Sequence, residues 1–217
     1  MENLQSFKVR ALNEEVFDEA ALLSIADSPL NELIEAAHEI TVQKASRVFN
    51  FCAIVNAKSG KCSENCRWCA QSRHYSAHCD IYPLLDASTV IECAKTAQEA
   101  GASRFSLVTS GRKLSPREVR ETAQIVRELK KETSLEICIS AGLLTEKEFI
   151  ELAQAGVTRC HCNLEAAESF FPTVCSSHTF DDKVKSLLAA RQAGLEICSG
   201  GIIGMGESRR ARAQLAI

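Results

Sequence analysis

Three glycine-containing turns constrain the fold of this chain more than any other feature. The pattern Ala-Gly followed by an apolar residue occurs at 100–102, 155–157 and 193–195, each time between a helix-like stretch and a short apolar run. Glycine is favoured just after a helix C-terminus because it adopts the left-handed backbone without steric strain. Each turn therefore predicts a helix that passes directly into a strand, and their recurrence predicts a repeating β/α unit.

The apolar runs between these turns are continuous rather than alternating, which is typical of parallel strands covered by helices. Such a series forms either an open parallel sheet or a (β/α)8 barrel. We expect an α/β fold of the TIM-type (β/α) barrel class, incomplete, with about five β/α units. The expected strands span 48–55, 104–109, 135–140, 158–164 and 195–198, and the expected helices span 90–100, 115–131, 146–155 and 180–193.

Helical spacing also marks the beginning of the chain. Apolar residues recur every three or four positions over 18–26 and 30–46. Ser28 and Pro29 predict the start of the second helix, with serine as the N-cap and proline at the first helical position. We therefore expect an N-terminal helical extension (1–46) ahead of the barrel portion (47–217).

The composition excludes several classes of protein. The 217 residues are 46% hydrophobic and 24% charged, which suits a globular chain in water. A net charge of −3 gives no sign of a nucleic-acid surface, and no apolar run approaches the roughly 18 residues that cross a membrane. The 11 cysteines are an odd number and no secretory signal begins the chain, so we expect a cytoplasmic protein with reduced thiols.

Three cysteines, Cys62, Cys66 and Cys69, have the spacing C-x3-C-x2-C. Three thiolates suffice for three irons of a cubane [4Fe–4S] cluster and leave the fourth iron open to a substrate. Zinc is the main alternative, although the first gap and the lack of a second C-x2-C favour the cluster. Unligated or paired cysteines are a third interpretation. The candidates for a fourth zinc ligand are His74, His78 and Cys79.

Several residues suited to chemistry follow the predicted strands. The cysteines follow the first strand, Asn163 and Glu165 follow the fourth, and Gly200 and Gly201 follow the fifth. In (β/α) barrels the active site lies at the carboxyl ends of the strands. We therefore expect these residues to lie around one site.

Two stretches, 56–72 around the cysteines and 194–207 at the fifth strand, resemble two sequence blocks of the biotin synthases, a family of radical S-adenosylmethionine (SAM) enzymes. The resemblance extends from about residue 30 to the last residue. It implies that Cys62, Cys66 and Cys69 hold a [4Fe–4S] cluster, whose open iron binds SAM as the source of a 5′-deoxyadenosyl radical. It also implies a sulfurtransferase that converts dethiobiotin to biotin, with flavodoxin or ferredoxin as electron donor. Homodimers are common in the family.

The resemblance gives roles to residues around the expected SAM site. It places Trp68 against the adenine, and Asn163 and Glu165 against the SAM ribose and the substrate, for which their acceptor oxygens are suited. It implies that Gly200 and Gly201 let the backbone approach SAM. Simpler roles exist for the same residues: loop packing for the tryptophan, capping of the next helix for the pair after strand four, and ordinary barrel turns for the glycines.

Biotin synthases also hold an auxiliary iron–sulfur cluster, which is a [2Fe–2S] cluster or a variant of it. Cys138 and Cys198 match its ligands on the third and fifth strands. Ser106 stands where the family has a cysteine on the second strand, and a hydroxyl is a weak iron ligand. Cys52 on the first strand is an alternative ligand, although a buried free cysteine often serves packing alone.

Other cysteines and histidines have no role that the sequence suggests. Cys160 and Cys162 depart from the family pattern beside Asn163. We expect Cys175 to be incidental, and His178 has no expected partner.

Biotin synthases are longer than 217 residues, so we expect this chain to be truncated and 1–217 alone to show little turnover. Two other functions stay open. One is another radical SAM enzyme, such as a hydrogenase-maturation relative, and the other is a non-catalytic fragment that binds an iron–sulfur cluster or zinc. Cys138 and Cys198 favour the biotin synthases over the first of these.

Overall fold

The computed structural model describes residues 3–217, which form two compact units. The sheet unit consists of residues 50–165 and 171–201. The helical unit consists of the described residues up to 49 together with 166–170 and 202–217. The expected division into an extension and a barrel portion stays a prediction.

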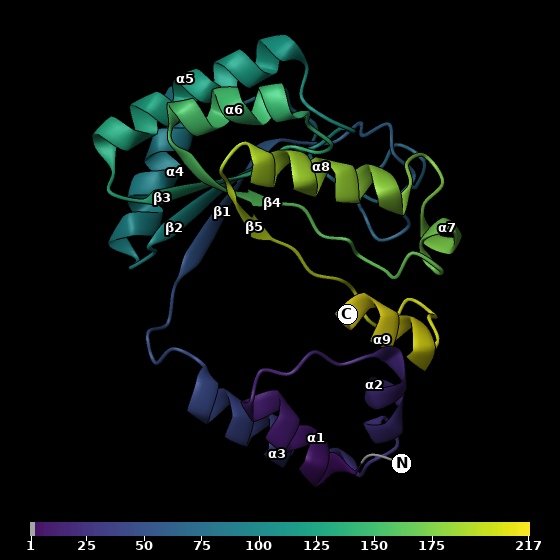
Figure 1. Ribbon diagram of the computed structural model, residues 1–217. Helices are drawn as coiled ribbons and strands as arrows, with labels where there is room; N and C mark the ends of the chain where they lie inside the picture. Colours follow the sequence, from purple (N-terminus) through teal and green to yellow (C-terminus); the bar gives the residue numbers. More distant parts are fainter. Residues whose placement is uncertain (1–2) are drawn as a thin grey trace. The chain divides into compact units, whose positions relative to one another are not determined.

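Five parallel strands form the sheet unit in the order β1-β2-β3-β4-β5 (Figure 1). Helices alternate with the strands and pack against one face of the sheet through a single hydrophobic core. This confirms the expected α/β fold, an incomplete (β/α) barrel. The strands are β1 (Cys52–Lys58), β2 (Arg104–Thr109), β3 (Glu136–Ser140), β4 (Val157–His161) and β5 (Glu196–Cys198), and the helices are α4 (Ala87–Glu99), α5 (Pro116–Glu132), α6 (Glu146–Ala155), α7 (Phe171–Val174) and α8 (Phe180–Gln192).

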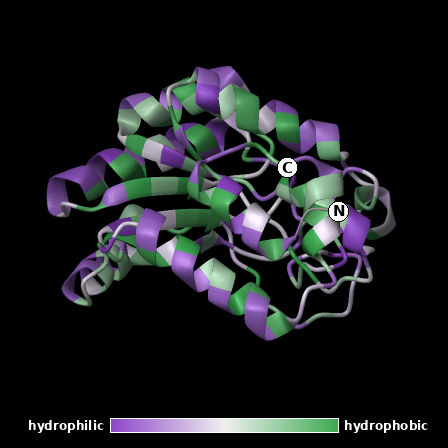
Figure 2. Ribbon diagram, turned by 60° about the horizontal axis from the view of Figure 1, so that its bottom comes forward, coloured by the Kyte–Doolittle hydropathy of each residue, from purple (hydrophilic) through white to green (hydrophobic). Residues whose placement is uncertain are grey.

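The core lies between the strands and the helices that cover them. Leu107 of β2 and Ile137 and Ile139 of β3 have 0% of their surface exposed, and Figure 2 shows apolar strands beside helices on which hydrophobic and hydrophilic turns alternate. Because successive side chains of a strand point to opposite faces, Ser106 and Cys138 belong to the other face of the sheet. We call this the inner face, and by the same alternation it also carries Cys52, Asn56, Arg104, Arg159, Glu196 and Cys198.

Helix α5 shows how the local sequence sets these elements. The hydroxyl of Ser115 accepts a hydrogen bond from the Glu118 amide at 3.3 Å, and the Glu118 carboxylate accepts one from the Ser115 amide at 2.8 Å. This capping box pairs backbone groups that a helix start otherwise leaves open, and Pro116 needs no partner at the first position. One side of the helix is buried in the core: Val119, Thr122, Ala123, Ile125, Val126 and Leu129.

The loops after β2 and β3 meet at Gly142. The Leu143 amide donates to the Arg112 carbonyl at 2.8 Å, and Lys113 pairs with Gly142 in an isolated bridge. A Cβ at position 142 would lie 2.2 Å from the Arg112 carbonyl oxygen, and the backbone φ there is +74°. Only glycine fits this position, so it joins two strand-end loops at the end of the sheet where the expected site lies.

The helical unit contains α1 (Leu4–Leu12), α2 (Glu19–Ile25), α3 (Leu30–Lys44) and α9 (Arg209–Ala216). The rings of Phe7 and Phe17 stack with their centroids 4.0 Å apart. The Gln214 side chain of α9 donates to the Glu19 carboxylate of α2 at 3.0 Å. Within residues 3–217, none of the helices has both the length and the apolar character of a membrane-spanning segment.

Several predicted boundaries of the sheet unit are wrong for local reasons. Strand β1 runs from Cys52 to Lys58 rather than over 48–55, because Cys52 is where pairing with β2 begins. Helix α4 begins at Ala87, because the Asp86 carboxylate accepts a hydrogen bond from the Thr89 amide at 2.9 Å and caps the helix. Strand β4 ends at His161 rather than at 164.

The helical unit also differs from expectation. Ser28 is not the N-cap of α3: Pro29 holds that position, makes no side-chain cap bond, and the helix begins at Leu30. Helix α1 has no counterpart among the predicted helices. It is capped by Asn3, whose side chain accepts from the Ser6 amide at 2.8 Å.

Candidate active site

The cysteine loop, residues 59–72, follows β1 and is closed by backbone hydrogen bonds. The Cys62 amide donates to the Gln71 carbonyl at 3.0 Å, and the Arg73 amide donates to the Cys62 carbonyl at 3.0 Å. These bonds hold the two ends of the loop together. Its three cysteines therefore have a common backbone frame.

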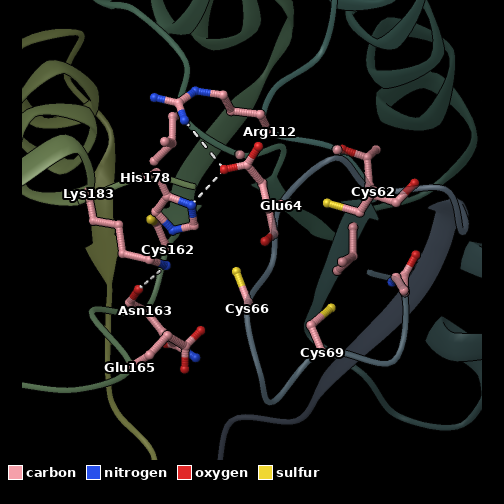
Figure 3. A pocket seen from close by; sticks show the side chains of 18 of the residues that line it. Cys62, Glu64, Cys66, Cys69, Arg112, Cys162, Asn163, Glu165, His178 and Lys183 are labelled. Carbon is pink, nitrogen blue, oxygen red and sulfur yellow. Dashed lines mark hydrogen bonds and ion pairs between the residues drawn. The ribbon is translucent and has the colours of Figure 1, made fainter. Parts of the chain in front are cut away.

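The loop borders a cavity of about 270 Å³ at the carboxyl ends of the strands. Cys62, Cys66 and Cys69 line one side, and Figure 3 shows their sulfur atoms turned toward a common space. The opposite side comes from the ends of β2, β3 and β4 and from α8. Its residues include Thr109, Ser140, His161, Asn163, Glu165 and Lys183.

The spacing of the three loop sulfurs bears on what they can hold. Two sulfurs on one tetrahedral zinc ion lie about 3.8 Å apart. Among residues 3–217, the loop cysteines do not form a set whose ligand atoms all lie within 4.8 Å of one another, with or without His74, His78 or Cys79. The His74 ring instead contacts the Ser63 carbonyl at 2.9 Å. Three thiols around one cavity, spread wider than one ion needs, fit a cluster of several irons.

A buried carboxylate–imidazole pair lies behind the loop. The Glu64 carboxylate and the His178 Nδ1 are 2.8 Å apart, and the two residues are 7% and 8% exposed. Burial alone would raise the pKa of Glu64, but hydrogen bonds with His178, Ser177 and Ser63 hold it below its ordinary value. Burial lowers the pKa of His178 in spite of the carboxylate. The pair is best described as a neutral imidazole whose Nδ1–H donates to ionised Glu64.

Cys175 connects this pair to the cysteine loop. Its sulfur lies 3.7 Å from the Cys66 sulfur and 3.5 Å from the His178 Nδ1. The Asn65 side chain accepts hydrogen bonds from the amides of Ser176 and Ser177 at 2.9 and 3.0 Å. Burial raises the pKa of the Cys66 thiol well above its ordinary value, and Cys175 raises it further.

The expectations that Cys175 is incidental and that His178 lacks a partner are therefore wrong. Both lie more than 100 residues along the chain from their partners in the loop. The sequence carries no periodic signal for such a contact. The only sign in the sequence is that Cys175 and His178 are three residues apart, and this spacing is too common to predict a joint role.

The residues after β4 converge on the cavity from the other side. The His161 ring lies 3.1 Å from the Asn163 side-chain oxygen, and the Lys183 ammonium donates to the Asn163 carbonyl at 2.8 Å. Glu165 has a backbone φ of +69°, and burial raises the pKa of its carboxyl. The Glu165 Oε2 and the Thr109 Oγ1 are buried without a hydrogen-bond partner. Because buried polar atoms are normally paired, these two atoms are positions that a polar ligand would satisfy.

Comparison with known proteins assigns this arrangement to a family. The model of the Radical SAM superfamily matches residues 57–216, which include the cysteine loop and every strand after β1. The chain belongs to the radical SAM superfamily. With that membership come a [4Fe–4S] cluster and SAM, and the three thiols and the unpaired oxygens of the cavity fit these two groups.

Radical SAM relatives with high similarity are named biotin synthases. Biotin synthase 2 of Corynebacterium diphtheriae is 49% identical over 201 residues, which are 92% of this chain and 60% of the relative. The biotin synthase of Brachyspira hyodysenteriae is 46% identical, with 90% of this chain and 59% of the relative covered. That of Porphyromonas gingivalis is 45% identical, with 98% and 65% covered. The chain thus spans about 60% of the length of the curated relatives it matches.

Solved structures agree with the radical SAM fold. Methylornithine synthase superimposes with a TM-score of 0.81 at 17% identity, covering 97% of this chain and 63% of that one. The FeFe-hydrogenase maturase HydG from Carboxydothermus hydrogenoformans gives a TM-score of 0.77 at 16% identity, covering 97% and 51%. Similarity at such low identity concerns the fold alone.

The other residues that we expect to contact SAM differ in whether they line the cavity. Trp68 lines the cavity, and its ring also packs edge-on against Phe171 with the centroids 6.2 Å apart. Gly200 and Gly201 are exposed and lie beside the cavity rather than in its lining. The Gly200 carbonyl accepts from the Glu165 amide at 3.1 Å, so this segment supports the turn that carries the Glu165 carboxylate.

The predicted auxiliary ligands share the inner face but lie at different levels along the strands. Ser106 and Cys138 are direct neighbours in the register of β2 and β3. Cys52 pairs with Arg104, two residues before Ser106. Cys198 pairs with His161, two residues after Arg159, which is the partner of Cys138. On one face of a strand, successive side chains are two residues apart. In the register of the sheet, Cys52, Cys138 and Cys198 therefore occupy three successive positions of this face.

The two cysteines without an assigned role differ in their access to the cavity. Cys160 is 2% exposed in the core between the sheet and the helices, and burial raises the pKa of its thiol to about 12. Cys162 is partly buried against the same core and also lines the cavity. The first therefore serves packing, whereas the second is accessible to a ligand in the site.

Proposed function

We propose that this chain carries the radical-generating and sulfur-donating sites of an enzyme that converts dethiobiotin to biotin. The observation that supports this most is its 45–49% identity to biotin synthases over 90% or more of the chain. The chemistry of the described residues is consistent with it. Thiols are gathered both in the cavity and on the inner face, as a reaction with two iron–sulfur sites requires.

Cys62, Cys66 and Cys69 hold the [4Fe–4S] cluster in this proposal. The cluster and SAM, when bound, supply a radical that abstracts hydrogen atoms from unactivated carbons. The protein positions these groups and excludes water from them. The Glu64–His178 pair and the Asn65 contacts fix the loop from behind, so that the thiols do not have to be ordered when the cluster arrives.

Asn163 and Glu165 bind SAM and orient the substrate. The carboxylate of Glu165 accepts hydrogen bonds from ribose hydroxyls through the oxygen that has no partner in the protein. Trp68 forms a flat apolar wall toward the adenine. The segment of Gly200 and Gly201 holds the Glu165 turn in place through the backbone bond between Gly200 and Glu165.

Cys52, Cys138 and Cys198 hold the auxiliary iron–sulfur cluster in this proposal, with Ser106 beside Cys138. Thiolates on three successive levels of one face suit a group larger than a single ion. Arg104 lies 3.8 Å from the Cys138 sulfur and provides positive charge for thiolates. Replacing Cys52 by Ser should remove the auxiliary iron and sulfide while the loop cluster remains; an unchanged iron and sulfide content after anaerobic reconstitution would refute the assignment of Cys52.

The remaining partners follow from the same proposal. Flavodoxin or ferredoxin supplies the electrons, dethiobiotin is the substrate, and two copies form a homodimer. The 11 free cysteines support an environment that keeps thiols reduced, as the cytoplasm does.

Anaerobic reconstitution with iron and sulfide, followed by reduction in the presence of SAM, tests the proposal. We expect 5′-deoxyadenosine to form, and its rate to rise when dethiobiotin is added. Formation of 5′-deoxyadenosine without any response to dethiobiotin would retain the radical SAM site and reject the substrate. A chain that takes up one zinc ion through Cys62, Cys66 and Cys69, and no iron, would reject the site as well.

A further inference from the structure

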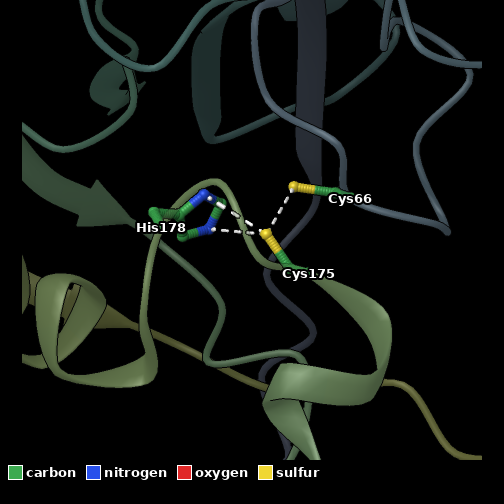
Figure 4. Close-up of side chains that lie close together, drawn as sticks. All are labelled: Cys66, Cys175 and His178. Atoms are coloured by element: carbon green, nitrogen blue, oxygen red, sulfur yellow. Dashed lines mark hydrogen bonds between the residues drawn. The ribbon is translucent and has the colours of Figure 1, made fainter.

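Cys66, Cys175 and His178 bring three metal-binding atoms together in the sheet unit (Figure 4). Cys66 belongs to the cysteine loop, whereas Cys175 and His178 lie between α7 and α8. The Cys175 sulfur lies 3.7 Å from the Cys66 sulfur and 3.5 and 3.8 Å from the Nδ1 and Nε2 of His178. Across residues 3–217, this is the set of three side chains whose ligand atoms all lie within 4.8 Å of one another.

The sulfur–sulfur spacing matches that of a tetrahedral zinc site, whereas the Cys175 sulfur is almost equidistant from the two ring nitrogens and has to move toward the Nε2 side when a metal binds. With Zn–S bonds of about 2.3 Å and Zn–N bonds of about 2.0 Å, tetrahedral angles place two sulfurs about 3.8 Å apart and a sulfur and a nitrogen about 3.6 Å apart. Two thiolates and an imidazole are also a ligand set that zinc prefers. We propose that the cluster-free chain binds one zinc ion through Cys66, Cys175 and the Nε2 of His178, with water as the fourth ligand.

The surroundings of His178 are those of a metal-bound histidine. Glu64 occupies the Nδ1 side at 2.8 Å, which leaves the Nε2, 3.8 Å from the Cys175 sulfur, as the ring nitrogen for a metal. A carboxylate that receives the second ring N–H of a histidine fixes the ring and strengthens it as a ligand. Cys175 and His178 are 4% and 8% exposed, and Asn65 holds the turn between them through the amides of Ser176 and Ser177. The three ligand side chains are therefore held together before a metal binds, and binding requires the Cys175 side chain to turn toward the Nε2.

Zinc at this site and the [4Fe–4S] cluster exclude each other, because both need the Cys66 thiolate. Zinc binding converts two thiols to thiolates and releases two protons, and no electron transfer is involved. A chain that has taken up zinc therefore cannot accept the cluster until the zinc leaves. This exclusion depends on the proposed role of Cys66, whereas the zinc site itself does not.

The affinity of the full chain for zinc, prepared anaerobically without iron, tests the site. Competition with a chromophoric chelator gives the affinity, and X-ray absorption gives the ligand atoms. We expect two sulfur neighbours and one nitrogen neighbour. Cys175→Ser and His178→Ala should each weaken zinc binding by at least about tenfold, and Glu64→Gln should weaken it by roughly 10–100-fold, as loss of a histidine partner does.

Two control variants separate this site from other thiols. The double variant Cys62→Ser/Cys69→Ser keeps the proposed ligands and should retain the zinc affinity. Cys93→Ser, which changes an exposed thiol on α4, should retain it too. Loss of the site in the double variant with its retention in Cys175→Ser would assign the zinc to the loop and overturn the proposal. Retention in both Cys175→Ser and His178→Ala would overturn it as well.

Folding and cluster assembly are controlled separately. Far-UV circular dichroism checks each variant, and Cys175→Ser decides the matter if His178→Ala does not fold. Zinc added before iron and sulfide should reduce cluster formation in the original chain and much less in Cys175→Ser; equal inhibition of both would overturn the exclusion. If no cluster forms even without zinc, the proposed function fails. The zinc affinities of the variants still show whether Cys66, Cys175 and His178 bind zinc.

Discussion

The two faces of the sheet differ in the kind of side chain that they carry. On the face covered by helices, Leu107, Ile137 and Ile139 are fully buried among apolar neighbours. On the inner face, the buried oxygens of Asn56 and Ser106 have no hydrogen-bond partner. The covered face is stabilised mainly by apolar packing, with the Thr122 hydroxyl of α5 as an unpaired group in its core, whereas the inner face and the cavity at its end carry several unpaired oxygens that a ligand would satisfy. Substitutions on the covered face should therefore lower the free energy of unfolding, whereas substitutions of the ligand-binding groups should lower activity or binding.

The largest expected effect is on the chemistry, with little effect on the fold. Cys69→Ser should reduce 5′-deoxyadenosine formation to background, because the cluster then has two thiolates of its three. The free energy of unfolding of the cluster-free chain should change by no more than about 0.5 kcal/mol. Product analysis and urea denaturation measure the two. Cys93→Ser is the matched control, and equal losses in both variants would contradict the assignment.

On the covered face, a substitution is expected to lower the stability of the fold. Ile139→Ala should lower the free energy of unfolding by about 2–5 kcal/mol, because it leaves a cavity in a closely packed core. Its neighbour Cys138→Ala, on the inner face, should cost about 1 kcal/mol or less in the cluster-free chain. Urea denaturation compares the two. A larger loss for the cysteine would show that the inner face is also packed for stability.

A smaller effect is expected for the Glu165 carboxylate, whose Oε2 has no hydrogen-bond partner. Glu165→Ala should weaken SAM binding to the cluster-loaded chain by roughly 10–100-fold, since a hydrogen bond to a charged group contributes about 1.5–3 kcal/mol. Equilibrium dialysis measures the affinity. Glu168→Ala, at an exposed position nearby in the sequence, serves as the control. Identical affinities for the two variants would remove Glu165 from the SAM site.

The smallest effect concerns a helix start and its dependence on pH. Burial would raise the pKa of Glu148, but its bonds with Thr145 and Lys113 hold it below the ordinary 4.5. A lowered pKa in the folded state means that the stabilisation is full above about pH 4.5 and is lost as the pH falls through the folded value. Glu148→Gln should cost about 1 kcal/mol near neutral pH. Urea denaturation should show this difference shrinking in acid; a constant difference would contradict it.

The sequence predicted well whatever depends on neighbouring residues. The turns at Gly101, Gly156 and Gly194 and the start of α5 at Ser115 follow from glycine and capping chemistry that acts within a few residues. The thiols of the cysteine loop line the cavity as their spacing suggested. The start of β1 could not be placed, because apolar residues continue before the point where pairing with β2 begins.

The contacts that the sequence could not predict join distant segments. The burial of Glu64 against His178 requires the loop after β1 and the turn before α8 to meet, which the tertiary arrangement of the parallel strands brings about. The different access of Cys160 and Cys162 to the cavity also depends on the exact end of β4. Both pack in or against the same core, but only Cys162, beyond the end of the strand, also lines the cavity.

The close approach at Gly142 carries a consequence for how this cavity tolerates change. Arg112, whose carbonyl oxygen occupies the space of a missing methyl group, also extends its guanidinium to within 3.4 Å of the Glu64 carboxylate. Adding one carbon atom at position 142 would push that backbone outward and draw the guanidinium with it. A change in the loop after β3 would thus act through the loop after β2 on the Glu64 carboxylate of the cysteine loop, although the three loops are not adjacent in the chain.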